Sequence, residues 1–514
     1  MARAAKKEKE VSLETVLWNC RVALRGIGST EKNRDAVISL VFLKFAGDKF
    51  EKRRAELKEQ YGDIPAFLEK VSFYNADNVF YLKETARWSY IVAHASSNDI
   101  AVILDQAMKD IEETNPSLRG ALSSRDKDGN PNYTFFATLG ASNTKIKDLI
   151  DNVNQIDEKR FQEEDLIGRV YEYFLQAYAA SGTKEDGEFY TPACVVKLIA
   201  EMIEPYSGVV YDPCCGSGDM FVQSAKFVQA HSGRRGTVAV YGQEAQADTW
   251  KMAKMNMAIR GIDADFGEHQ ADTFTHDLHP TLKADFILAN PPFNYHPWNQ
   301  EKLKDDPRWK YGLPPANNAN FAWIQHMIYH LAPNGKIGLV LANGALATQS
   351  SGEGDIRKKI IEADLVEGII ALPTQLFYSV TIPVTLWFIS KNKKQKGKTV
   401  FIDARKMGHM VDRKHRDFSD KDIEKLADTF TAFQEGNLED VKGFCSVATI
   451  QDIEKQDYIL TPGRYVGIEE QEDDGEPFEE KMSRLTSELS EMFEKSHELE
   501  DEIRKKLGAI GYEI

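Results

Sequence analysis

Two short turns, each placed directly after an apolar strand, constrain this chain more than any other feature. The first turn, at 213–218, interrupts a strand predicted at 209–212 and precedes a helical run at 220–227. The second turn is Asn290-Pro291-Pro292-Phe293, which follows a buried strand predicted at 284–289. A strand, a loop and a helix in this order form the crossover unit of a parallel sheet. We therefore expect the second turn to enter a ligand crevice at the carboxyl ends of the strands.

The first turn carries two glycines in the stretch Asp212-Pro213-Cys214-Cys215-Gly216-Ser217-Gly218-Asp219. Glycine has no Cβ atom to keep a ligand from the backbone, and the helix start behind the turn presents free N–H groups. The loop lacks the third glycine of GxGxxG, which favours a seat for a smaller charged group over a pyrophosphate cradle. An ordinary strand-to-helix turn is the alternative. The predicted ligand contacts are Asp212, Gly216, Ser217, Gly218 and Asp219, the last through its backbone alone.

Two further acidic residues are expected beside this turn. A strand predicted at 237–241 ends at Gly242-Gln243-Glu244, where the Glu244 carboxylate can accept hydrogen bonds from two ribose hydroxyls. Asp272, followed by Thr273, stands where the third strand is expected to end, so that it can meet an adenine edge. Together these positions predict an adenosine-containing ligand.

The second turn has the residue types needed to activate an amine on a base. The lone pair of an exocyclic amine is delocalised into the ring, so the amine is a poor nucleophile. The Asn290 side-chain oxygen and the Pro291 carbonyl can accept its two hydrogens and localise that lone pair. Pro291 and Pro292 fix φ and stiffen the turn, and Phe293 offers a face on which the base can stack. No strong base is required, because methyl transfer from a sulfonium can precede proton loss.

DPCCGSG followed by NPPF resembles the S-adenosylmethionine-dependent amino-methyltransferases that act on adenine N6. Upstream, Gly187-Glu188-Phe189-Tyr190-Thr191-Pro192 resembles the segment that lies over the methionine part of the cofactor in one subgroup of that family. The resemblance implies S-adenosyl-L-methionine as cofactor, with additional contacts from Glu188, Phe189, Tyr190, Thr191 and Pro192. The five cysteines form no CxxC pair, and no metal site is expected.

Charge and targeting features set further limits. The net charge of −16 does not suit a protein that binds nucleic acid with its whole surface, so any DNA contact must be local or shared with a partner. The densest basic run, 391–398, lies between two strand-like segments and reads as a solvated hairpin or as a phosphate contact. The charged start has no apolar region behind it, and no apolar run approaches a membrane span. We expect a cytoplasmic protein.

The chain divides into three predicted domains. Residues 1–160 read as helices, for example 35–50 and 100–113, the latter with Val102, Ile103, Ala107 and Ile111 on one face. Residues 161–468 alternate strands and helices, which predicts a doubly wound, mainly parallel Rossmann-like methyltransferase sheet. Further elements of that domain are a helix at 321–331 and strands at 337–341, 365–372 and 384–389. Residues 469–514 read as an acidic linker followed by a coiled-coil-like helix.

The front of the chain also has a family resemblance. Leu24-Arg25-Gly26 through Phe45 resembles the helical amino-terminal domain of type I restriction-modification methyltransferase subunits, and 165–173 resembles their entry into the catalytic domain. The resemblance covers nearly the whole chain and implies an antiparallel last strand. It also implies partners: a specificity subunit that reads the DNA site and a restriction subunit that cleaves.

The terminal helix bears on where DNA sequence is read. Its apolar positions keep mostly three-and-four spacing and are Met482, Leu485, Leu489, Met492, Leu499, Ile503 and Leu507. So narrow a stripe on a charged helix favours another helix as partner, although packing back on its own domain is equally open. About fifty residues follow Tyr465, too few for a recognition domain, so we expect recognition in a separate polypeptide that this helix holds.

The sequence therefore predicts the modification subunit of a type I complex, which methylates adenine N6 in double-stranded DNA. One alternative is a methyltransferase for protein glutamine or RNA, which can share NPPF-like turns. The other is a scaffold subunit that keeps the fold for assembly only. Cofactor titration and the identity of the methylated product separate the three.

Overall fold

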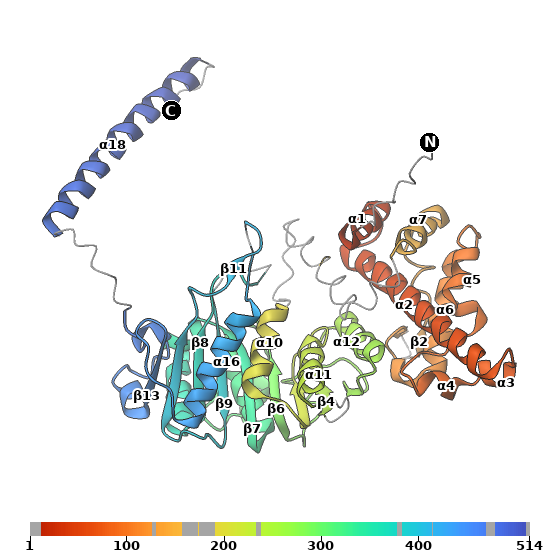
Figure 1. Cartoon of the computed structure of the whole chain (residues 1–514), viewed down its shortest axis with the longest axis horizontal. Coiled ribbons are helices and arrows are strands. Elements are labelled where there is room, and N and C mark those ends of the chain that lie inside the picture. Colours follow the sequence, from red (N-terminus) through yellow and green to blue (C-terminus); the bar gives the residue numbers. More distant parts are fainter. Residues whose placement is uncertain are drawn as a thin grey trace, which may run out of the picture. The chain divides into compact units, whose positions relative to one another are not determined.

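The computed structural model describes residues 12–125, 130–156, 173, 191–232, 238–377, 383–413, 415–468 and 478–509. The chain forms two compact units, Met1–Gly467 and Ile468–Ile514. The first unit contains a helical part and a large sheet, and the second contains one long helix (Figure 1).

The helical part is built from amphipathic helices with polar caps. Ser12, Ser29 and Ser142 each accept a hydrogen bond from a backbone N–H three residues on, which satisfies a free donor at the helix start. In chain order the elements are α1 Leu13–Ala23, α2 Thr30–Tyr61, α3 Pro65–Leu68, α4 Val71–Asn75, η1 Glu84–Ala86, α5 Trp88–Ala93, α6 Ile100–Thr114, η2 Pro116–Leu118, β1 Ser124–Arg125, β2 Pro131–Asn132 and α7 Asn143–Val153.

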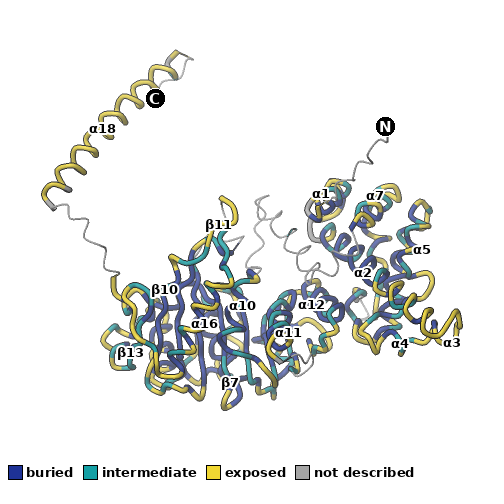
Figure 2. Tube along the Cα trace, viewed as in Figure 1, coloured by how far each residue is buried: buried dark blue, intermediate teal, exposed yellow. Residues whose placement is uncertain are grey.

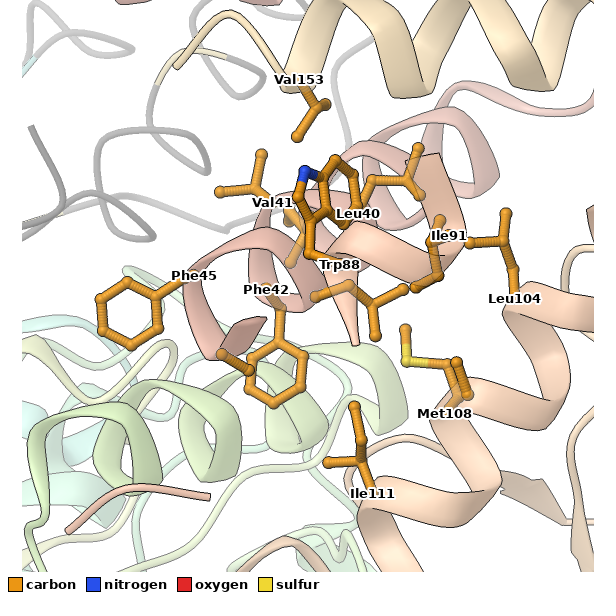
Figure 3. Close-up of a cluster of buried hydrophobic side chains, with 14 of the residues drawn as sticks. Leu40, Val41, Phe42, Phe45, Trp88, Ile91, Leu104, Met108, Ile111 and Val153 are labelled. Atoms are coloured by element: carbon orange, nitrogen blue, oxygen red, sulfur yellow. The ribbon is translucent and has the colours of Figure 1, made fainter. Parts of the chain in front are cut away.

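Helix α2 is the central element of the helical core. Phe42 and Trp88 lie in the buried cluster between α2, α5 and α6 (Figure 3). Gly47 of α2 allows α5 to approach α2 closely, because a Cβ at this position would lie 2.5 Å from Trp88 Cβ. The predicted face of α6 is partly wrong: Val102 is 59% exposed, and the buried side is formed by Ile100, Leu104, Ala107, Met108 and Ile111. The buried side of α6 therefore lies next to the predicted face and shares Ala107 and Ile111 with it.

A nine-stranded sheet, in the order β13-β10-β8-β9-β7-β6-β3-β4-β5, forms the second part of this unit (Figure 1). Pairing is parallel except that β9 runs against both neighbours, β7 and β8, and β13 runs against β10. The strands are β3 Gly208–Asp212, β4 Val238–Gly242, β5 Ala264–Asp265, β6 Ala284–Ala289, β7 Leu331–Ala342, β8 Val366–Ala371, β9 Val384–Ser390, β10 Lys398–Asp403 and β13 Cys445–Thr449. The predicted doubly wound, mainly parallel sheet is confirmed, as is its antiparallel last strand.

Helices cover both faces of the sheet because buried side chains alternate along the strands. Val210 packs into one cluster with residues of α10, α11, α12 and α16, whereas Tyr211 packs into another with residues of α13 and α15. The central strands are buried on both faces (Figure 2). The connecting elements are α10 Ala193–Ile203, α11 Asp219–Ser232, α12 Ala247–Arg260, η3 Gln300–Leu303, α13 Asn320–His330, α14 Gly344–Ala347, η4 Ser350–Gly352, α15 Glu353–Glu362, β11 His409–Met410, β12 Arg416–Asp417, α16 Asp420–Glu435, α17 Ile450–Glu454 and η5 Pro462–Arg464.

The strands predicted around the two turns are confirmed to within a residue or two, but two others differ. β7 begins earlier than predicted, and its irregular register, in which 331–336 lie opposite 284–286, accommodates the turn expected at 333–335. The third strand, β5, is only two residues long and ends at Asp265. It lies at one edge of the sheet and pairs with β4 alone.

The basic run 391–398 does not form a hairpin. It leads from β9 to β10, which are not neighbours, because β8 lies between them. Lys393 is buried and its Nζ lies 2.6 Å from Asp364 Oδ1, while Gly397 N donates to Asp364 Oδ2 at 2.9 Å. The hairpin interpretation is therefore wrong, and the run is a crossover held by one carboxylate.

The second unit is the helix α18 Phe478–Ala509. Most of its described apolar side chains are exposed, Met492 by 65% and Leu489 by 50%, whereas Leu507 is half-buried. None of the helices in the described part of the chain combines the length and the apolar character needed to cross a membrane.

Candidate active site

The glycine turn connects β3 to α11 and has the predicted form. Gly216 and Gly218 have φ of +54° and +86°, in the region that strains L side chains. A Cβ at Gly218 would lie 2.9 Å from Met257 Cε, the movable end of that side chain, so the positive φ is the stronger reason for glycine at this position. A Cβ at Gly216 would meet nothing within 4 Å, so this glycine faces space that a ligand can use.

Two of the predicted acids meet at this turn. Asp212 is buried, its Oδ1 accepts from Cys214 N at 3.0 Å, and burial raises the pKa of its carboxyl to about 7. Glu244 Oε2 accepts from Gly216 N at 3.1 Å, and its Oε1 accepts from Gln246 N at 2.8 Å. Each carboxylate oxygen has a second lone pair, so Glu244 can fix the glycine turn and still accept from a hydroxyl.

Gln243, which sequence reasoning did not select, holds the turn to its neighbours. It is fully buried, its backbone N donates to Asp212 O at 3.0 Å, and its backbone O accepts from Cys215 N at 2.9 Å. Its side chain donates to Ala271 O at 3.1 Å and accepts from Leu278 N at 3.0 Å. A polar residue directly after a buried strand was the signal that could have identified it.

Asp272 does not end the third strand, because β5 stops at Asp265 and Asp272 lies in the loop that follows. Its Oδ1 accepts from Thr275 N at 2.8 Å and from Thr275 Oγ1 at 2.7 Å, which closes a turn. Thr273 is buried, and its hydroxyl donates to Pro213 O at 2.5 Å. The loop is therefore bound to the glycine turn through Thr273, and contact of Asp272 with an adenine edge stays a prediction.

Asn290 follows β6 at the carboxyl edge of the sheet, where a threonine hydroxyl holds its amide nitrogen. Asn290 Nδ2 donates to Thr191 Oγ1 at 2.8 Å. Thr191 is followed by Pro192, the N-cap of α10. Because the amide nitrogen faces the threonine hydroxyl, the two ends of the amide have defined directions. The structure thus brings Thr191 and Asn290, predicted for different roles, into direct contact.

The other members of the predicted set have simpler positions. Pro291 is buried, Pro292 is half-buried, and Phe293 is half-buried and packs against the core on the α10 face of the sheet. Glu188, Phe189 and Tyr190 lie outside the described residues. Burial raises the pKa of the Cys214 and Cys215 thiols, as expected for side chains that line the turn and do not react.

The chain beyond NPPF is fixed by asparagines that were not predicted. Asn294 N donates to Asn320 Oδ1 at 3.1 Å, and Asn320 Nδ2 donates back to Asn294 Oδ1 at 3.0 Å. Asn318 Nδ2 donates to the same Asn294 oxygen at 3.2 Å. Asn320 begins α13, so this pair ties the end of the NPPF turn to a helix of the core. The asparagine-rich stretch before this helix was the available signal.

Arg308 joins the loop beside the glycine turn to the segment after NPPF. Its Nη1 and Nη2 donate to Thr273 O at 3.0 Å and Phe274 O at 2.5 Å. Nε and Nη2 also donate to the carboxylate of Asp306, and Nη1 lies 3.1 Å from His326 Nδ1. All five N–H groups of this buried guanidinium thus have acceptors. Nothing in the sequence distinguishes this arginine from others.

Asp277, His326 and His330 are the one group in the described part of the chain whose ligand atoms lie close enough, within 4.8 Å, to hold a metal. Protein groups already engage these atoms. Arg308 donates to His326 Nδ1, and Tyr211 Oη lies 3.1 Å from His326 Nε2. His330 Nε2 lies 2.9 Å from Asp277 Oδ2, and its Nδ1 lies 3.1 Å from Leu282 O. A guanidinium against one ring opposes a cation, so the group reads as a buried hydrogen-bond network.

Comparison with known proteins matches both the helical part and the sheet part of the first unit. The family described as N-6 DNA Methylase matches residues 162–474, and the HsdM N-terminal domain matches residues 13–153. The HindI type I restriction enzyme methylase subunit of Haemophilus influenzae is 51% identical over 80% of this chain and 93% of its own length. The MjaIX methylase subunit of Methanocaldococcus jannaschii is 37% identical over 97% of this chain and 91% of its own length.

Among solved structures, the type I restriction-modification methyltransferase subunit of Streptococcus thermophilus is similar with a TM-score of 0.72 and 26% identity. The match covers 89% of this chain and all of that one. The family predicted from the glycine turn and NPPF is therefore confirmed. The chain belongs to the N-6 DNA methylase family, as a methylase subunit of the type I restriction-modification kind.

Proposed function

We propose that this chain transfers the methyl group of S-adenosyl-L-methionine to N6 of adenine in double-stranded DNA. The observation that carries the proposal is the Asn290 amide at the end of β6. Its nitrogen is held at 2.8 Å by Thr191, and the glycine turn follows the neighbouring strand β3. We further propose that a separate specificity subunit reads the DNA site and that a restriction subunit joins the full complex.

The residues around the glycine turn fit the proposed cofactor. S-adenosyl-L-methionine supplies a methyl group on a positively charged sulfur. Its adenosine needs acceptors for two ribose hydroxyls, which Glu244 can provide while it also binds the Gly216 N–H. The open space at Gly216 leaves room for the rest of the molecule, and the buried Asp212 carboxyl lies beside this turn. Thr191, Thr273 and the 216–219 loop complete the proposed contacts within the described residues.

The chain's own groups act on the base. Asn290 Oδ1 and the Pro291 carbonyl accept the two N6 hydrogens, which concentrates the nitrogen lone pair toward the methyl group. Thr191 sets the amide so that its oxygen, and not its nitrogen, is presented to the amine. Phe293 stacks on the base, which must leave the duplex to reach this turn. As the new N–C bond forms, the bond between the methyl carbon and the sulfonium sulfur breaks and its electron pair stays on sulfur. The positive charge moves to N6, whose proton then leaves to water.

The terminal helix supports the proposed partner. The apolar residues along α18 that are at least 43% exposed are Met482, Leu485, Leu489, Met492, Phe493, Leu499 and Ile503. A helix of this length with a narrow apolar stripe is stabilised by burying that stripe against another helix. We propose that a helix of the specificity subunit covers it.

The test is transfer of labelled methyl to mixed-sequence duplex DNA, by this chain alone and with the proteins of its neighbouring genes, followed by nucleoside analysis. We expect N6-methyladenine only with a partner. Asn290→Ala should lower turnover at least ~100-fold with cofactor affinity retained, as for loss of one preorganised polar group. Asn392→Ala, on an exposed asparagine of the 391–398 crossover, is the matched control.

Other outcomes point elsewhere. Cofactor binding without methylated DNA, with any partner, would favour a protein or RNA substrate. Absence of cofactor binding would favour a scaffold subunit. Near-native turnover by Asn290→Ala would remove Asn290 from the mechanism.

A further inference from the structure

A short basic hairpin, β11–β12, follows the end of strand β10 (Figure 1). The stretch 405–416 contains one acidic residue, Asp412. Its basic residues are Arg405, Lys406, His409, Arg413, Lys414, His415 and Arg416. In a chain with a net charge of −16, this concentration of positive charge calls for a local explanation.

Strand direction places this hairpin at the edge of the sheet that carries the active site. β10 is parallel to β8, and both β8 and β7 are antiparallel to β9 between them. β7 is in turn parallel to β6, so β10 and β6 end at the same edge. Four strand spacings separate β10 from β6, which is about 19 Å and close to the width of a DNA duplex.

The base of the hairpin is fixed to the elements that build the site. Arg416 N donates to Gln375 O at 2.9 Å, in the segment that follows β8. Just past the hairpin, Asp420 Oδ1 lies 2.7 Å from Lys197 Nζ of α10. Helix α10 begins after its N-cap Pro192, which follows Thr191, the residue that holds Asn290. The hairpin therefore has a rigid attachment close to the proposed catalytic turn.

The exposed residues of the hairpin are of the types that contact nucleic acid. Lys406, His409 and Arg413 are exposed, and so are the apolar Met410 and Val411, the latter by 60%. Cations pair with phosphates without regard to sequence, and apolar side chains can lie against the sugars between them. A contact of this kind positions a duplex and leaves the reading of bases to another element.

We infer that the β11–β12 hairpin binds the phosphates of the duplex whose adenine enters the NPPF turn, and so holds that duplex over the carboxyl edge of the sheet. The inference rests on the proposed function. It assigns to this chain a sequence-independent share of DNA binding, beside the sequence reading assigned to a partner.

The test measures binding of a labelled mixed-sequence duplex of about 40 base pairs over a range of salt, with the full chain and its co-expressed partner. Lys406→Gln/Arg413→Gln should lower the slope of log K against log salt by about 1.8, because each lost phosphate contact removes about 0.9. The same slope change gives about a 30-fold weaker Kd at ~0.15 M salt. Val411→Lys, which adds a charge at the exposed tip, should change the slope in the opposite direction.

Lys394→Gln/Lys396→Gln is the matched control. These exposed lysines lie in the 391–398 crossover, which leaves the antiparallel strand β9 at the opposite edge of the sheet. The control should bind like the native chain, and all variants should retain cofactor affinity, which confirms folding.

The outcomes separate this inference from the proposed function. If the native complex methylates DNA and the hairpin variants keep its salt slope, the inference is wrong and the function stands. If the complex binds DNA but never methylates it, the proposed function is wrong. The difference in salt slope between native and variant proteins still shows whether the hairpin contacts phosphates. If the hairpin variants no longer bind the co-expressed partner while the salt dependence of their DNA binding is unchanged, the hairpin contacts protein and the inference is overturned.

Discussion

Replacing Thr191 by valine tests the geometry of the proposed site at its most specific contact. The valine side chain has nearly the shape of threonine, so packing at the start of α10 is retained and the hydroxyl is removed. The hydroxyl oxygen accepts from Asn290 Nδ2 at 2.8 Å in a part-buried position. A partly buried donor that loses its acceptor costs about 1–3 kcal/mol, or about 5- to 150-fold in a rate that depends on its orientation.

We expect Thr191→Val to lower the single-turnover rate of methyl transfer about tenfold at saturating cofactor and DNA. The dissociation constant for S-adenosyl-L-methionine should change much less, because the loss concerns the direction of the Asn290 amide. Thr191→Ser keeps the hydroxyl and should recover most of the rate. Equal rates for the valine, serine and native proteins would falsify the view that Thr191 orients Asn290. Equal losses in valine and serine would assign the effect to packing.

Two further predictions concern other parts of the molecule. Burial raises the pKa of Asp212 to about 7, so the folded state holds a proton that the unfolded state has released between about pH 4 and 7. The free energy of unfolding of the native protein therefore falls as pH rises through this window. Between pH 4 and pH 8, the free energy of unfolding of Asp212→Asn, measured with urea, should rise by up to about 4 kcal/mol relative to that of the native protein. Parallel curves for the two proteins would contradict this. Leu489→Asp in the α18 stripe should abolish co-purification with the specificity partner, whereas Ser490→Asp, on a neighbouring face, should not. Unfolding of the first unit should be unchanged in both.

The parts of the site that the sequence predicted are those in which a local rule fixes the structure. An apolar run bounded by turn residues defined β6 at its observed limits, and glycines between a strand and a helix placed the turn at Gly216 and Gly218. In a parallel sheet the ends of such strands share an edge, so Asn290 and Asp212 were correctly expected there.

The parts that could not be predicted depend on contacts between distant segments. Asp272 was placed at a strand end because strand length was assumed, whereas β5 has one neighbour and stops after two residues. Gln243 and Arg308 acquire their importance from the backbone carbonyls that they reach, at Ala271 and Thr273. No periodicity or motif encodes such partners, because they become neighbours only when the sheet forms.

The two basic stretches of the chain show how topology decides what composition leaves open. The run at 391–398 is the denser of the two in lysine, and in the sequence it was the candidate for a phosphate contact. It leaves β9, which is antiparallel, so it lies at the opposite edge from Asn290, with Lys393 turned inward to Asp364. The stretch at 405–416 leaves a parallel strand and reaches the active-site edge. The direction of a single strand, which no local pattern in the sequence specifies, thus determines which of two similar charge clusters lies at the edge of the sheet that carries Asn290.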